Sequence, residues 1–186
     1  MNTNNKKNIV IKIGTTSIIK NDKVDLTLLK SLAELIIENK NKFNFVIVTS
    51  GAVGLGATKL NYKSRPKSLK RLQVASAVGQ IELINQYEKI FKDKKMNIAQ
   101  VLITKNLIDD REQFVNTTQA LNELLSQEII PVINENDVVA TEELKFGDND
   151  RLSAIVSFGE VRKCPLTKLP SFFKYGSIQA ILGLPE

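Results

Sequence analysis

The sequence contains no histidine and no tryptophan, and it has a single cysteine, Cys164. Without imidazole, Ser-His and Cys-His nucleophilic mechanisms are excluded, and so are His-ligated metal sites. One cysteine excludes an internal disulfide and a cysteine-rich zinc cluster, which agrees with a reducing compartment. Any chemistry that this chain performs must therefore proceed without imidazole.

Long hydrophobic runs are also missing. No apolar stretch approaches the roughly 18 residues that a membrane-spanning helix requires, and the polar segment MNTNNKKNIV precedes the first expected strand. We therefore expect a cytoplasmic protein with no membrane partner. At 186 residues, with 42% hydrophobic and 25% charged residues, the chain is long enough for one domain with its own core.

The net charge of +6 and two groups of basic residues could indicate a nucleic-acid partner. The first group consists of Lys59, Lys63, Arg65, Lys67, Lys70 and Arg71, and the second of Lys89, Lys92, Lys94 and Lys95. Few aromatic residues accompany them, and the second group lies at the end of an expected helix, where cations interact favourably with the helix dipole. We favour solvated helix faces and expect no nucleic-acid partner.

Short apolar runs alternate with helical patterns up to about residue 156, which is typical of parallel βαβ units. Strands are expected at 9–13, 45–49, 97–103 and 129–133, and helices after Asp25, at about 68–93 and after Asp110. The apolar side of the long helix is expected to hold Val74, Val78, Ile81, Ile84, Tyr87 and Phe91. After Ser157 the pattern shows no clear strand-helix rhythm.

Each expected strand is followed by small or polar residues: 14–17, 49–52, 104–106 and 134–137. These segments would converge at one edge of a parallel sheet and line a crevice there, where open α/β sheets bind their ligands. Lys12 in the first strand would suit a phosphate, and Gly51 beside Ser50 is expected to touch ligand. Close helix packing is the simpler explanation for Gly54 and Gly56. Neither a Walker loop nor the dinucleotide fingerprint is present.

Two acid-amide clusters, INEND and GDND, dominate residues 131–156. Their side chains could bind an amino acid, with carboxylates for its ammonium group and amides for its carboxylate. The residues concerned are Asn134, Asp137, Asp148, Asn149 and Asp150. Calcium is the alternative ligand, although the loop lacks the twelve-residue pattern that ends in glutamate.

Together these segments resemble the glutamate 5-kinases, a branch of the amino acid kinase family, over residues 8 to about 156. The resemblance is carried by VIKIGTTS, IVTSGAVGLG, AVGQ at 77–80, DDREQFVN, PVINENDVVAT and FGDNDRLSA. It implies an α/β fold, an open, mainly parallel sheet with helices on both faces, here truncated after its N-terminal half. It also implies transfer of the γ-phosphoryl group of ATP, with Mg²⁺, to the side-chain carboxylate of L-glutamate, the first step of proline biosynthesis.

The resemblance further implies roles for individual residues. Lys12 resembles the family's phosphate-binding catalytic lysine, and Asp150 the aspartate that orients the catalytic lysines. Gly14 would lie on the phosphate side of the ATP site. The positions that match the glutamate-binding set are Ser50, Asp137 and Asn149, and we expect Gly51 and Asn134 to bind the same substrate. A glutamate side chain, with an ordinary pKa near 4.3, is ionised at neutral pH and needs no general base, which suits a chain without histidine.

Residues 157–186 depart from the family, which continues with a Thr-Asp nucleotide loop and a glycine-rich segment bearing a second catalytic lysine. Neither occurs here. We therefore expect 1–156 to be the N-terminal, acceptor-binding part of the domain and 157–186 to be a foreign or frameshifted tail, with the adenine-side residues absent. Alternatives are an inactive fragment that binds glutamate, proline or an intact subunit, or another member of the family. The resemblance also implies a homo-oligomer, proline as feedback inhibitor and glutamate-5-semialdehyde dehydrogenase as pathway partner.

Overall fold

A computed structural model of the chain describes residues 6–104, 107, 110–139 and 141, together with the backbone of 161–163 and 178–183. Its main element is a 6-stranded sheet in the order β5-β6-β4-β1-β8-β7. The strands are β1 (Lys7–Ile13), β4 (Phe43–Val48), β5 (Ile98–Ile103), β6 (Ile130–Glu135), β7 (Val161–Lys163) and β8 (Ile178–Gly183). The four strands expected from the sequence are thus confirmed.

Neighbouring strands from β5 to β1 run parallel, and β8 pairs antiparallel with the free side of β1. The expected mainly parallel α/β sheet is therefore confirmed. The absence of strand rhythm after Ser157 was misleading, because β7 and β8 lie in that region and extend the sheet. Pairing along an open strand edge uses backbone N–H and C=O groups, so it does not require an alternating apolar pattern.

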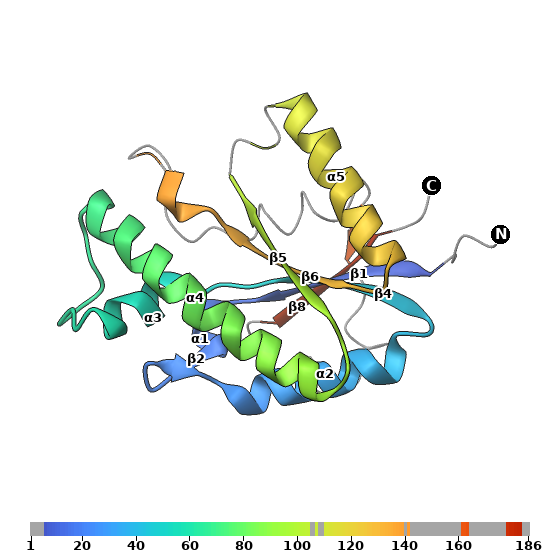
Figure 1. Cartoon of the computed structure of the whole chain (residues 1–186), viewed down its shortest axis with the longest axis horizontal. Coiled ribbons are helices and arrows are strands. Elements are labelled where there is room, and N and C mark those ends of the chain that lie inside the picture. The colour runs from blue at the N-terminus through green and yellow to red at the C-terminus, as the bar shows by residue number, and fades with distance from the viewer. Residues whose placement is uncertain are drawn as a thin grey trace.

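Helices cover both faces of the sheet (Figure 1). Alternate residues of β1 and β4 point to opposite faces. Ile9, Ile11 and Ile13 belong to a core cluster with residues of α2 (Leu26–Asn39) and α4 (Leu69–Asp93). Val10 packs instead in a second cluster with residues of α5 (Arg111–Ser126). The result is a three-layer arrangement with α2 and α4 on one face and α5 on the other.

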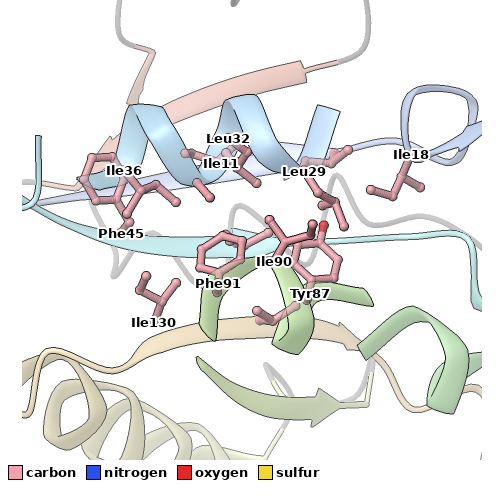
Figure 2. Packing of buried hydrophobic residues seen from close by; sticks show 14 of the residues in the cluster. Ile11, Ile18, Leu29, Leu32, Ile36, Phe45, Tyr87, Ile90, Phe91 and Ile130 are labelled. Atoms are coloured by element: carbon pink, nitrogen blue, oxygen red, sulfur yellow. The ribbon is translucent and has the colours of Figure 1, made fainter. Parts of the chain in front are cut away.

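The larger core lies where α2 and α4 meet the sheet. Figure 2 shows Leu32 and Ile36 of α2, Tyr87 and Phe91 of α4 and Phe45 of β4 gathered around it. The rings of Tyr87 and Phe91 lie 6.1 Å apart between centroids. Burial of several large side chains, each contributing about 1.5–3 kcal/mol, holds α4 firmly against the sheet.

Two helices begin at the capping residues that the sequence predicts. Asp25 accepts hydrogen bonds from the backbone N–H groups of Thr27 and Leu28 at the start of α2. Asp110 accepts bonds from the backbone and side-chain nitrogens of Gln113 in α5. Burial opposes the ionisation of Asp25, but its bonds from Lys20, Leu28 and Thr27 together lower its pKa.

The buried face of α4 differs from the predicted one. Val74 and Ile81 are 49% and 61% exposed. Tyr87 and Phe91 are buried as predicted, whereas the other buried residues of the helix are Ala75, Ser76, Gly79, Gln80, Leu83 and Ile90. The helix is rotated because its first half packs on another helix rather than on the sheet.

This partner is α3 (Ala52–Lys59), which crosses α4 at very short distance. A Cβ atom on Gly56 would lie 1.7 Å from the carbonyl oxygen of Ala75, and one on Gly79 would lie 1.9 Å from that of Ala52. Close packing is therefore confirmed for Gly56. It is wrong for Gly54, whose added Cβ would meet no atom within 4 Å.

Candidate functional site

A cleft opens at the carboxyl ends of β4 and β6, where Val48 and Ile133 are register partners. It has a volume of about 310 Å³, at the small end of the range for ligand pockets. The sheet edge contributes Ser50, Gly51, Asn134, Glu135 and Asp137 to its lining. The structure thus brings together four of the residues predicted to bind substrate: Ser50, Gly51, Asn134 and Asp137.

Gly51 turns the chain from β4 into α3. Its φ of 105° lies in the left-handed region, and a Cβ atom there would lie 3.0–3.1 Å from the side chains of Ile18 and Ile19. The positive φ favours glycine, and the nearby isoleucine side chains leave little room for a Cβ. Its carbonyl oxygen accepts the backbone N–H of Leu55 and so starts the helix. The backbone at Ser50 and Gly51 is thereby held at the cleft wall.

Two side chains of α4 form hydrogen bonds with cleft residues, one of which lies in β6 and the other in the turn after it. Ser76 donates a hydrogen bond of 2.7 Å to Oδ2 of Asp137. Asn134 donates through Nδ2 to Oε1 of Gln80, also at 2.7 Å. All four residues are buried or nearly so. Asn134 and Asp137 line the cleft, so α4 supports its floor from behind.

A third buried bond supports the exit of β4. The hydroxyl of Tyr87 donates to Oγ1 of Thr49 at 3.0 Å. The backbone N–H of Thr49 donates to the carbonyl oxygen of Ile133, which continues the β4–β6 pairing beyond the strand. Burial strongly raises the pKa of the Tyr87 phenol, and the bond to Thr49 offsets only part of this effect. Tyr87 is therefore neutral at physiological pH.

Charged residues of both signs surround the cleft. Asp22 comes from the hairpin between β2 (Ile19–Lys20) and β3 (Lys23–Val24), and Lys63 and Arg65 come from the loop before α4. The loop is anchored where the guanidinium of Arg71 lies 5.7 Å from the ring centroid of Tyr62. These residues were missed as site residues, because neither the hairpin nor the fold of the loop is visible in the hydrophobic pattern.

Lys12 and Gly14 lie at the carboxyl end of β1 but are not among the residues lining the cleft. Lys12 follows Val10 by two residues on the same strand, so its side chain projects from the same face of the sheet, the one covered by α5. Gly14 has φ −74°, which any residue can adopt, so no left-handed turn explains it. The remaining predicted residues, Asp148, Asn149 and Asp150, lie outside the described residues. The roles of all these residues stay predictions.

Residues 6–104, 107, 110–139 and 141 hold no cluster of three or more His, Cys, Asp or Glu side chains that could hold a metal ion. Among the same residues, no helix combines the length and the apolar character needed to cross a bilayer.

Comparison with known proteins is consistent with this geometry. The profile of the amino acid kinase family matches residues 7–157. The chain belongs to the amino acid kinase family. The match covers every described residue that lines the cleft.

Relatives within the amino acid kinase family are named glutamate 5-kinase. That of Prochlorococcus marinus strain MIT 9312 is 48% identical over 156 residues, which is 81% of this chain and 42% of that protein. The glutamate 5-kinase of Clostridium tetani is 42% identical over 153 residues, 81% of this chain and 57% of that protein. The chain therefore spans about half the length, or less, of the curated relatives it matches.

Proposed function

We propose that this chain forms the acceptor-binding part of a glutamate 5-kinase. The observation that carries the proposal is the meeting of Ser50, Gly51, Asn134 and Asp137 in one small cleft with charges of both signs at its rim. A zwitterionic amino acid suits such a lining, because carboxylate and amide oxygens accept from its ammonium group while backbone N–H groups and cations bind its carboxylates.

In the proposed reaction, an oxygen of the side-chain carboxylate of L-glutamate attacks the γ-phosphorus of ATP. The bond from that phosphorus to the β,γ-bridging oxygen breaks, and ADP leaves with the electron pair. The carboxylate is already ionised at neutral pH, so no general base is needed. Catalysis then depends on alignment and on neutralising charge, which Lys12 and a bound Mg²⁺ would supply.

Because Lys12 projects on the α5 face at the end of β1, we infer that the phosphate donor approaches from that side. Asn149 would complete the glutamate site, and Asp150 would orient Lys12. We further propose a cytoplasmic homo-oligomer with proline as feedback inhibitor, whose acyl phosphate product passes to glutamate-5-semialdehyde dehydrogenase. An acyl phosphate hydrolyses readily, which favours direct use by a reductase.

Trapping with hydroxylamine tests the activity, since it converts an acyl phosphate into a hydroxamate that forms a coloured complex with added Fe³⁺. We expect colour that requires both ATP and glutamate and that is lost in Lys12→Ala. Colour no stronger than that of the Lys12→Ala control would reject phosphoryl transfer by this chain.

A second candidate is a binding fragment without catalysis, which is favoured by the 42% coverage of the Prochlorococcus relative. Isothermal calorimetry separates the two candidates. A complete kinase should give heats with both glutamate and ATP, whereas the fragment should respond to glutamate alone.

A further inference from the structure

A pair of buried amides lies beneath the cleft. Asn134 is 3% exposed and lines the cleft, whereas Gln80 of α4 is 9% exposed and lies behind it, outside the lining. Nδ2 of Asn134 donates to Oε1 of Gln80 at 2.7 Å. A buried polar side chain without a partner costs about 1–3 kcal/mol, so this bond restricts how the Asn134 amide can turn.

The direction of the bond decides which atom Asn134 offers to a ligand. Because Nδ2 is engaged with Gln80 on the α4 side, Oδ1 is the polar atom on the opposite side of the amide. An amide oxygen only accepts hydrogen bonds. Asn134 lines the cleft, and Oδ1 is the acceptor that its amide keeps when Nδ2 donates to Gln80.

Asp137 is held in a parallel way. Ser76 lies one turn before Gln80 on the same face of α4 and donates to Oδ2 of Asp137 at 2.7 Å. A carboxylate is also an acceptor. Two acceptor groups, one at the end of β6 and one in the turn after it, are thus oriented by successive turns of one helix, and this arrangement suits a donor-rich cation.

We propose that Gln80 is a positioning residue that turns the Asn134 amide so that Oδ1 receives the α-ammonium group of the amino acid acceptor. This inference rests on the proposed function. It differs from the expectation that the amides of this cluster bind the substrate carboxylate, because Asn134 would take the ammonium end.

The test compares L-glutamate with glutarate, which keeps both carboxylates but lacks the ammonium group. Calorimetry on wild type, Gln80→Met and Gln86→Met gives the ratio of the two affinities. Gln86 is the matched control, because it lies on the same helix and bonds Glu82 instead of the cleft residues. In Gln80→Met we expect glutamate affinity to fall about tenfold while glutarate affinity changes less than twofold, as loss of one charge-assisted hydrogen bond predicts.

An equal loss for both ligands would show a merely structural role and overturn the proposal, as would an unchanged ratio. Equal affinities of the wild-type chain for L-glutamate and glutarate would also overturn it. Wild type that binds neither ligand overturns the proposed function itself.

Two further measurements test the proposal if the Gln80→Met variant does not fold. Gln80→Glu keeps an oxygen that can accept from Asn134, so a folded variant should retain the wild-type ratio. In wild type, glutamate should shift the side-chain amide resonances of Asn134 in a ¹⁵N spectrum more than glutarate does. The positioning role is contradicted if Gln80→Glu no longer prefers L-glutamate over glutarate as wild type does. It is also contradicted if both ligands shift the Asn134 amide resonances equally.

Discussion

Single polar atoms behind the cleft link its geometry to the stability of the core. The hydroxyl of Tyr87 is fully enclosed beside Phe91 and Leu83, yet it reaches Thr49 at the end of β4. A buried phenolate would lie in an apolar environment, which explains the raised pKa of this group. The same bond that completes the core therefore also fixes the strand end next to Ser50.

We expect Tyr87→Phe to alter the pH dependence of stability. At pH 8 the variant should lose about 0.5–1.5 kcal/mol, because Thr49 loses its partner. The folded state of wild type favours the protonated phenol, so this contribution is full below the ordinary pKa of 10.0 and is lost as the pH rises above it. The gap between wild type and variant should therefore shrink between pH 10 and 11, roughly one unit above the unfolded pKa.

Urea unfolding followed by circular dichroism at several pH values measures this gap, and the remaining tyrosines and lysines act as a shared background. A gap that is independent of pH would mean that Tyr87 ionises as easily in the folded chain as in the unfolded one.

At the scale of elements, α4 has two functions along its length. Its second half buries Leu83, Tyr87 and Phe91 in the core, as an ordinary amphipathic helix would. Its first half approaches α3 through Gly56 and Gly79 and supports the cleft through its polar side chains. The second contact explains why apolar residues such as Val74 and Ile81 are exposed.

Two glycines of α3 offer a matched test of this contact. Gly56→Ala should destabilise the chain by about 1–3 kcal/mol, because the new methyl group overlaps backbone atoms of Ala75 and Gly79, which cannot move separately from α4. Gly54→Ala should be neutral or stabilise by up to about 1 kcal/mol, because its methyl group has open space and alanine favours a helix. Chemical unfolding of both variants gives the comparison. Similar effects would contradict close packing at Gly56.

At the scale of the whole molecule, the parallel strands place the segments after β4 and β6 at one edge of the sheet. The far side of β1 is paired with β8, from Asn8 opposite Gly183 to Ile13 opposite Ile178. An open strand edge would otherwise present unpaired backbone groups for association. Strands β8 and β7 therefore extend the sheet on the side of β1 away from β4.

Deletion of residues 158–186 tests this contribution. We expect lower unfolding free energy and concentration-dependent association, since β1 would lose its antiparallel neighbour. Glutamate binding per folded chain should persist, because the described cleft residues extend no further than Asp137. Circular dichroism and analytical ultracentrifugation provide the measurements. A deletion variant as stable and as monodisperse as the full chain would show that β8 contributes nothing.

The sequence by itself determined the parallel α/β core and much of the cleft. Apolar runs of strand length and the caps at Asp25 and Asp110 depend on local chemistry, which a sequence displays directly. Four small or polar residues at strand ends were predicted to meet, because carboxyl ends of parallel strands share one edge. Family membership followed from the same segments.

Only the tertiary structure decided which face of α4 is buried, where Lys12 projects and which residues stand behind the cleft. Burial of Ser76 and Gln80 violates the hydrophobic pattern and depends on partners 61 and 54 residues away. The rotation of α4 follows from backbone contact at two glycines, and the position of β8 from pairing along an edge. Such long-range contacts have no periodic signature, so no reading of local pattern could reveal them.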